Sequence, residues 1–125
     1  PNEIKPGSFT EFPGHFIDFM ATFVDITEAE YPEAYNGQMI TPMKGKSLLP
    51  VLKGDEMERD EPLFWEWRQG RAVRDDGWKL VKEGLNKPWE LYNMVNDPTE
   101  TDDLAERFPD KVAELDALFN GWYER

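Results

Sequence analysis

The chain has 125 residues, enough for one domain or for one piece of a larger one. It carries 26 acidic and 14 basic side chains, for a formal net charge of -12. This surface argues against nucleic acid and anionic membrane faces as partners, because like charges repel. The absence of cysteine excludes disulfides and thiolate metal sites. No apolar run approaches a bilayer span, and Pro1 in place of Met predicts a processed N-terminus or an excised segment.

One segment in the first 60 residues has a clear helical period. Residues 14–27 place apolar side chains at the spacing of one helical face: Phe16, Phe19, Met20, Phe23 and Val24. The spacing predicts a helix over about residues 14–27, with a broad aromatic face that needs a cover. His15 is expected just inside the start of this helix.

The chain after this helix is irregular until residue 47. Ser47 is predicted to cap a short helix that closes near Gly54. The charged run at residues 55–61 predicts a solvated loop.

Residues 62–94 contain four short runs rich in aromatic and aliphatic side chains, separated by turn signals. In the first run Leu63, Trp65 and Trp67 alternate with Phe64 and Glu66, as the two faces of a strand do. Two glycine-containing turns and a longer loop separate the runs: residues 68–70, 75–77 and 83–88. The pattern predicts an antiparallel meander of four strands.

A second amphipathic helix is predicted near the C-terminus, over about residues 109–123. Pro109 suits the first helical position. The apolar stripe consists of Val112, Leu115, Leu118, Phe119 and Trp122. The predicted fold class is therefore α+β, a four-stranded antiparallel sheet packed against a long C-terminal helix.

Residues that carry chemistry are sparse. His15 is the one histidine, and neither Ser8 nor Ser47 lies in a Gly-x-Ser-x-Gly context. The acidic pairs Asp75-Asp76 and Asp102-Asp103 are explained by a hairpin turn and a helix start. We therefore predict no catalytic residue and no metal ligand in this chain.

The tryptophans of the sheet allow two interpretations. Trp65, Trp67, Trp78 and Trp89 form a sugar-stacking platform, or they fill the core of a small sheet that is poor in aliphatic residues. The first would make the chain a free-standing carbohydrate-binding β-module.

An ordered succession of short motifs resembles the C-terminal part of the arylsulfatase family, from about Pro6 to Arg125. The motifs are, in chain order, His15-x-x-Asp18, Asp25-Ile26, residues 45–54 (GKSLLPVLKG), Leu63-Phe64-Trp65-Glu66, Arg71-Ala72-Val73-Arg74, Gly77-Trp78-Lys79-Leu80-Val81, Pro88-Trp89-Glu90-Leu91-Tyr92, Asp97-Pro98-Thr99-Glu100 and Asp103-Leu104-Ala105.

The resemblance implies a parent enzyme with a large N-terminal domain like that of alkaline phosphatase. That domain carries a formylglycine, made in a C/S-x-P/A-x-R motif, and a Ca²⁺ ion. A smaller C-terminal subdomain with a four-stranded antiparallel sheet and a long helix follows it. Residues 1–60 then correspond to the end of the large domain and the crossover, and residues 61–125 to the subdomain.

This chain departs from the family in lacking the formylglycine motif, since Ser8 precedes Phe-Thr-Glu-Phe and Ser47 precedes Leu-Leu-Pro-Val. No catalytic residue of the family carries over. The chain alone is therefore expected to be inactive and to hold no cofactor, with Ca²⁺ and formylglycine in the parent. The resemblance also suggests a periplasmic or secreted parent.

The expected partners are the missing N-terminal sulfatase domain and a sulfated small molecule or glycan. His15, Trp65, Glu66 and Arg71 are the residues expected nearest the substrate. Arg71 is suited to a sulfate or uronate oxygen. In the alternative interpretation Arg71 and Arg74 simply pair with Glu66 and Asp75.

Two further expectations concern the chain as a whole. The aromatic face of the Phe16–Val24 helix would be exposed without its cover and would favour self-association. A parent in the same superfamily with a different leaving group, a phosphodiesterase or phosphonate hydrolase, stays open at this point.

Overall fold

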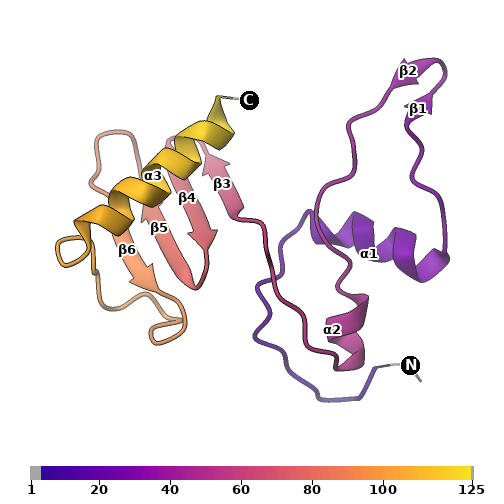
Figure 1. The fold of residues 1–125 in the computed structure, drawn as a ribbon, viewed down its shortest axis with the longest axis horizontal. Helices are drawn as coiled ribbons and strands as arrows, with labels where there is room; N and C mark the ends of the chain where they lie inside the picture. Colours follow the sequence, from indigo (N-terminus) through magenta and orange to yellow (C-terminus); the bar gives the residue numbers. More distant parts are fainter. Residues whose placement is uncertain (1–3, 125) are drawn as a thin grey trace. The chain divides into compact units, whose positions relative to one another are not determined.

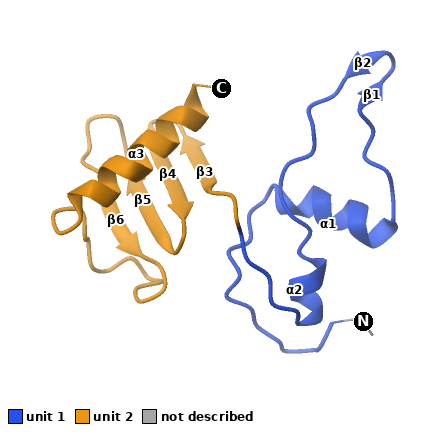
Figure 2. Cartoon of the chain, in the orientation of Figure 1, with its two compact units in different colours: residues 1–59 blue, residues 60–125 orange. Residues whose placement is uncertain are grey.

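The computed structural model describes residues 4–124 of the chain. The contacts of the chain divide it into two compact units, Pro1–Arg59 and Asp60–Arg125 (Figure 2). Within residues 4–124, no helix combines the length and the apolar character that crossing a membrane requires.

The first unit consists of two helices and one short hairpin joined by irregular segments (Figure 1). The helices are α1, Asp18–Thr27, and α2, Leu49–Lys53, and they contact each other. The hairpin pairs β1, Ala34–Tyr35, with β2, Gln38–Met39, in antiparallel register. The Asn36-Gly37 pair that joins them has positive φ at both residues, 50° and 77°, as a two-residue turn of this kind requires.

Helix α1 begins at Asp18 rather than at residue 14, so the prediction that His15 lies inside the helix is wrong. The two residues before Asp18 form a turn, in which the Asp18 N–H donates to the His15 carbonyl at 3.0 Å. The His15 N–H in turn donates to the Asp18 carboxylate at 2.7 Å. These two bonds between His15 and Asp18 close the turn that precedes the helix.

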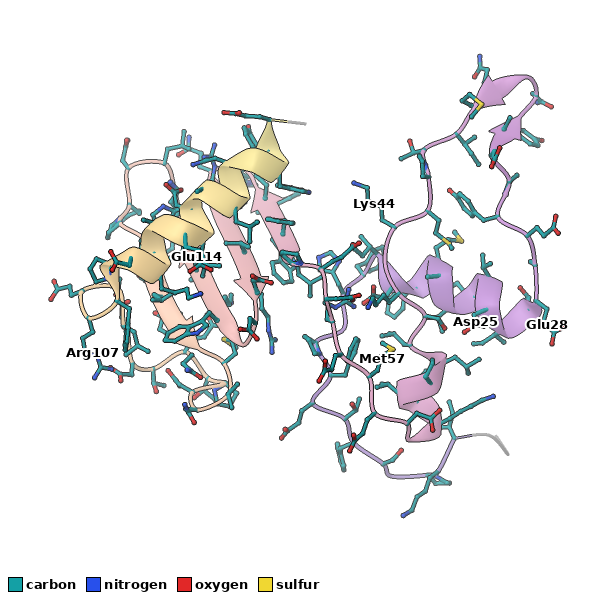
Figure 3. All side chains as sticks on the ribbon, viewed as in Figure 1. Asp25, Glu28, Lys44, Met57, Arg107 and Glu114 are labelled. Atoms are coloured by element: carbon teal, nitrogen blue, oxygen red, sulfur yellow. The ribbon has the colours of Figure 1, made fainter. Side chains whose placement is uncertain are left out.

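Ser47 lies one position before the residue that caps α2, because the cap is Leu48. Its hydroxyl accepts the Leu49 N–H at 3.2 Å and donates to the carboxylate of Asp25. The Asp25 side chain belongs to the last turns of α1 (Figure 3). Ser47 therefore links α1 to the start of α2 instead of acting as the cap. Gly54, with φ of 101°, closes α2 as predicted.

The second unit is a four-stranded antiparallel sheet with one long helix across it (Figure 1). The strands follow each other in chain order: β3, Leu63–Trp67; β4, Gly70–Asp75; β5, Trp78–Lys82; and β6, Glu90–Asn93. The helix is α3, Pro109–Tyr123, with Pro109 in its first turn. The predicted α+β class, the meander and the C-terminal helix are confirmed.

The core of this unit lies between the sheet and α3. Val73, Leu80 and Leu91 are aligned across β4, β5 and β6 by the strand register. Leu115 and Phe119 of α3 pack on them, and all five side chains are fully buried. Apolar residues on one face of the sheet therefore pack against the apolar stripe of the helix. The burial of this apolar surface stabilises the two-layer arrangement of sheet and helix.

The loop between β6 and α3 covers the outer edge of the sheet. The Leu104 N–H donates to the Leu91 carbonyl at 2.8 Å, and the Asp103 carboxylate accepts the Leu91 N–H at 2.9 Å. These bonds satisfy backbone groups of β6 that an uncovered edge strand would leave open.

Candidate functional site

A buried carboxylate organises the first unit. Asp18 is fully buried and forms an ion pair with Arg59, whose side chain is 6% exposed. The Arg59 Nε also donates to the Pro13 carbonyl at 3.0 Å, and the guanidinium lies 5.2 Å from the centre of the Phe12 ring. The prediction that residues 55–61 form a solvated loop is therefore wrong for Arg59, because the buried Asp18 needs a cation.

The segment that precedes α2 is tied to the same carboxylate. The Lys46 N–H donates to Asp18 Oδ1 at 2.9 Å, and the Leu48 N–H donates to the Thr22 hydroxyl at 2.9 Å. The Thr22 hydroxyl donates to the Asp18 carbonyl at 2.7 Å. Gly45 has φ of 90°, and a Cβ there would lie 2.5 Å from the Ile17 carbonyl oxygen. These contacts fix the chain over the first turn of α1.

His15 lies half-buried beside this network. Its Nδ1 accepts the Ile17 N–H at 3.2 Å, so the ring is held against the turn before α1. Burial lowers the pKa of His15, the Asp18 carboxylate opposes that change, and the Arg59 guanidinium adds to it. The net shift keeps the imidazole neutral near pH 7.

Helix α1 buries its small and polar side and exposes its aromatic side. The buried residues are Asp18, Ala21 and Thr22. The exposed large side chains of α1 are Phe19, Met20, Phe23 and Ile26, and those of the turn before it are Phe16 and Ile17, with exposed fractions from 40% to 81%. The Phe16, Phe19 and Phe23 rings contact one another in sequence along the helix. Exposed apolar faces of this kind are typical of surfaces that contact another element or protein.

In the second unit the predicted residues divide between the two faces of the sheet. Glu66 and Arg71 are directly opposite each other on β3 and β4, on the face that α3 covers. Trp65 lies on the other face, because successive strand residues alternate. His15 belongs to the first unit.

Arg71 does not pair with Glu66. Its guanidinium lies over two rings of α3, 5.4 Å from the centre of Phe119 and 4.7 Å from that of Tyr123. Within the described residues, Arg74 and Asp75 form no ion pair either. The interpretation of the two arginines as simple partners of the neighbouring carboxylates is therefore wrong.

The four tryptophans of the sheet do not form one platform. Trp78 and Trp89 pack against the core on the α3 side, and the Trp89 indole N–H donates to Asp116 of α3 at 3.1 Å. Trp65 and Trp67 lie on the opposite face, with exposed fractions of 37% and 76%. Core packing explains the first pair, so the interpretation of a Trp-based carbohydrate-binding module loses half of its residues.

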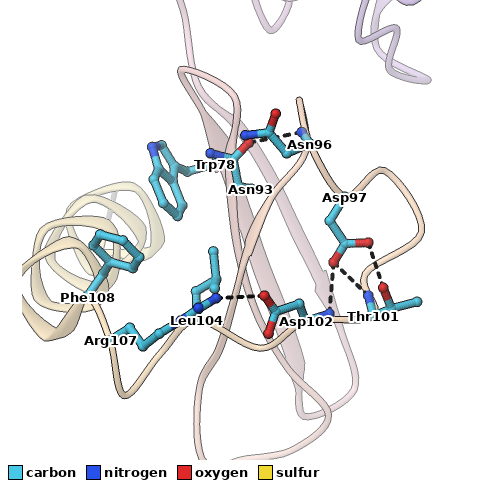
Figure 4. Close-up of a pocket in the computed structure, with 9 residues that line it drawn as sticks. All are labelled: Trp78, Asn93, Asn96, Asp97, Thr101, Asp102, Leu104, Arg107 and Phe108. Atoms are coloured by element: carbon cyan, nitrogen blue, oxygen red, sulfur yellow. Dashed lines mark hydrogen bonds and ion pairs between the residues drawn. The ribbon is translucent and has the colours of Figure 1, made fainter.

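A pocket of about 550 Å³ lies between β5, β6 and the loop that precedes α3 (Figure 4). Its lining consists of Trp78, Asn93, Asn96, Asp97, Thr101, Asp102, Leu104, Arg107 and Phe108. The Asp97 carboxylate already accepts the N–H groups of Asp102 and Thr101, at 2.9 and 2.7 Å, and these bonds lower its pKa. Asp102 pairs with Arg107 at 2.6 Å. The polar groups of the pocket therefore stabilise the loop itself.

The residues present do not fit the calcium and formylglycine of the sulfatase family. Within residues 4–124, no three His, Asp or Glu side chains are grouped so that they could hold a metal ion. The Ser47 hydroxyl is bonded to Asp25. Asp76 lies in the turn between β4 and β5, and Asp103 holds the edge of β6. No catalytic step is assigned to any of them.

The prediction from sequence missed two residues. Arg59 was hidden in a charged run, and its partner Asp18 is 41 positions away, so no local pattern could reveal the pair. Lys82 lies directly opposite Arg71 across β4 and β5, with its ammonium 4.3 Å from the centre of the Trp89 ring. A signal for Lys82 did exist, because strand alternation places it on the same face as Trp78 and Leu80.

The chain is similar to known sulfatases along most of its length. An uncharacterized sulfatase of Schizosaccharomyces pombe is 28% identical over 121 residues, which cover 92% of this chain and 22% of that protein. Arylsulfatase K of Danio rerio is 28% identical over 127 residues, with 92% and 23% covered. The chain thus spans about a fifth to a quarter of the length of these relatives.

Solved structures share the fold. A protein in complex with its substrate, D-glucosamine-2-N,6-O-disulfate, superposes with a TM-score of 0.68 at 23% identity, over 99% of this chain and 26% of that one. The family model described as N-sulphoglucosamine sulphohydrolase, C-terminal, matches residues 1–118. The chain therefore belongs to this family, whose members form the C-terminal part of sulfatases.

Proposed function

We propose that the chain is the C-terminal part of a longer sulfuric ester hydrolase and does not catalyse the reaction by itself. The observation that carries this proposal is the family match over residues 1–118, in a chain about a fifth to a quarter as long as its relatives. In this proposal residues 1–60 form the end of the large domain and the segment that crosses from it to the C-terminal subdomain. Residues 61–125 form that subdomain. The division of the chain into two compact units, with the boundary in the sequence between Arg59 and Asp60, supports that assignment.

The missing N-terminal domain is the proposed partner of α1. The aromatic face of Phe16, Phe19 and Phe23 is exposed, although aromatic side chains of a helix are normally buried against another element. In the parent, this face would pack on the large domain. In the isolated chain, the same face would promote self-association.

The nucleophile and the metal are proposed to come from the large domain. Cleavage of a sulfate ester needs a strong nucleophile and stabilisation of the charge on the leaving group. The proposed suppliers are the formylglycine and Ca²⁺ of the parent, for which the described part of this chain contains no suitable cluster.

An activity assay of two samples tests the proposal. The purified chain and the full-length protein encoded with it would each be incubated with an aryl sulfate and Ca²⁺. We expect turnover from the full-length protein and none above a heat-killed control from the chain. Turnover by the chain alone would contradict the proposal. A full-length protein that cleaves phosphodiesters or phosphonates but no sulfate ester would favour the related hydrolases instead.

The proposed substrate is a sulfated carbohydrate. The protein solved with D-glucosamine-2-N,6-O-disulfate as its substrate shares the fold at low identity, which motivates this class without selecting one sugar. We also propose a periplasmic or secreted parent, as the sulfatase resemblance suggests. Cell fractionation with an antibody against this chain tests that location, and a parent confined to the cytoplasm would contradict it.

His15, Trp65, Glu66 and Arg71 are the proposed substrate-proximal residues. The strongest of them is Arg71, whose guanidinium is held by two aromatic rings and has no carboxylate partner within the described residues. In the full-length enzyme, Arg71→Ala should raise KM roughly tenfold or more, the effect of losing one charged hydrogen bond. Unchanged kinetics would remove Arg71 from the site.

A further inference from the structure

Three charged side chains form a row across one end of the sheet. The strand register places Glu66 on β3 opposite Arg71 on β4, and Arg71 opposite Lys82 on β5. Directly opposed residues on one face have Cβ atoms about 5 Å apart, and like charges in that arrangement destabilise a sheet. Arg71 and Lys82 are such a pair.

Glu66, the carboxylate opposite Arg71, is exposed and forms no ion pair with it. Within residues 4–124, the structure shows no ion pair for Arg71 or Lys82, although the chain has 26 acidic side chains. Lys79 and Lys111 of the same unit are paired, with Glu100 at 2.6 Å and Glu114 at 2.8 Å. Arg74 also lacks an ion pair within the described residues, so Arg71 and Lys82 are distinguished by lying directly opposite each other on one face.

The Arg71 guanidinium also has an unmet hydrogen-bond donor. Its Nε is buried and has no hydrogen-bond partner in the part of the chain that the structure describes. A buried N–H without an acceptor is unfavourable, and such a group often marks the place of an ion or ligand. The opposed cations and the open donor are independent observations, and both would be satisfied by an oxyanion.

Aromatic rings hold the two cations in place. The Arg71 guanidinium lies over Phe119 and Tyr123, and the Lys82 ammonium lies over Trp89. Stacking of this kind fixes the direction of a guanidinium while leaving N–H groups at its edge for an acceptor. Phe119 is fully buried, but Tyr123 is 48% exposed and Trp89 is half-buried, so these two rings present apolar surface of the type that sugar rings contact.

We propose that Arg71 and Lys82 form a subsite for the oxyanion of an anionic saccharide, a sulfate or a carboxylate. The guanidinium donates N–H groups to two oxygens of the anion, and the ammonium donates to a third or neutralises it. That the ligand is a saccharide rests on the proposed function. Binding of the oxyanion by these two residues does not.

The test is a titration of the intact chain with three sugars that share one ring: D-glucose 6-sulfate, D-glucuronate and D-glucose. NMR would follow the Arg71 Nε–H and the Trp89 indole N–H at fixed salt, into the millimolar range. We expect saturable shifts with at least one anionic sugar and none with glucose. The stronger of the two anions identifies sulfate or carboxylate as the natural group. The net charge of -12 disfavours non-specific binding of either anion.

Variants distinguish the subsite from a purely structural role of the cations. Lys82→Gln should weaken binding about tenfold or more, as expected when one charged hydrogen bond is lost, whereas Lys82→Arg should retain it. Lys111→Gln, which removes a cation that is paired with Glu114, is the matched control. It should bind the anionic sugar as tightly as the unmodified chain does. The NMR spectrum of each variant reports whether it is folded.

The proposal is overturned if neither anionic sugar gives a saturable shift. It is also overturned if the folded Lys82→Gln variant binds the anionic sugar as tightly as the unmodified chain does. This result can be separated from a failure of the proposed function, because the titration involves no turnover. If the chain binds glucose 6-sulfate but the full-length protein has no sulfatase activity, the proposed subsite stands and the proposed reaction does not.

Discussion

The Asp18 carboxylate joins three segments of the first unit that lie far apart in the sequence. It accepts the N–H groups of His15 and Lys46 and pairs with Arg59. Removing one charge of a buried ion pair costs about 3–5 kcal/mol, because the other charge stays buried alone. We expect Asp18→Asn to destabilise the first unit by that order, and the Lys46 amide to lose protection in hydrogen exchange.

Asp55→Asn is the matched control for this prediction. Asp55 is exposed and accepts no side-chain hydrogen bond within the described residues, so its replacement should leave the Lys46 amide protected. If the Lys46 amide exchanged at the same rate in Asp18→Asn as in the parent chain, the carboxylate would not be what holds this segment.

Tyr92 makes a pH-dependent contribution at the residue scale. Burial, the hydrogen bond that it donates to Glu90 at 2.8 Å and the nearby carboxylates together raise its pKa from 10.0 to about 12. Between these values the unfolded chain releases the phenolic proton while the folded chain retains it, so stability falls as pH rises through this window. We expect Tyr92→Phe to remove this contribution to the loss of stability at alkaline pH.

The measurement is the urea midpoint of the second unit from neutral pH to about pH 12. Tyr35→Phe in β1, at a tyrosine that is 70% exposed, serves as the control. A Tyr92→Phe chain with the same alkaline decline as the parent chain would refute the assignment.

At the scale of elements, two glycines with positive φ separate the effect of backbone strain from that of contact. Gly37, in the turn between β1 and β2, has φ of 77° and open space around its position. Gly45 has φ of 90°, and a Cβ there would meet the Ile17 carbonyl oxygen at 2.5 Å and Asp18 Oδ1 at 2.8 Å. Alanine at either position is strained by about 1–2 kcal/mol, but only at Gly45 does it also displace α1.

We therefore expect Gly45→Ala to destabilise the first unit more than Gly37→Ala does, by roughly a further 2 kcal/mol. Urea unfolding of both variants, followed by far-ultraviolet circular dichroism, measures the difference. Equal losses would mean that the segment before α2 can move away from α1 without cost.

The elements that sequence predicts well are those with local causes. The alternation from Leu63 to Trp67, the Asp76-Gly77 turn and Pro109 at the start of α3 each act within a few residues, and the sheet and α3 appear as expected. The start of α1 was misplaced because it depends on the Asp18 carboxylate, whose partner Arg59 is remote in sequence. An ion pair between Arg71 and Glu66 was predicted from the opposite charges of two neighbouring strands. In the structure the Arg71 guanidinium lies over the rings of Phe119 and Tyr123 of α3 instead.

At the scale of the whole molecule, two opposing properties decide how copies of the chain behave together. The aromatic face of α1, with Phe19 and Phe23 exposed at 48% and 59%, favours association. The net charge of -12 opposes it through repulsion between copies. Added salt screens the repulsion within about 10 Å at 0.1 M and leaves the apolar attraction in place.

We therefore expect the weight-average mass in sedimentation velocity to rise with salt and with protein concentration. Phe19→Lys should abolish that rise, because it places a charge in the middle of the aromatic face. Phe9→Lys is the matched control, since Phe9 is fully exposed and lies outside α1. This variant should associate as the unmodified chain does. A parent chain that stays monomeric at high salt would show that the exposed face of α1 is too small to hold two copies together.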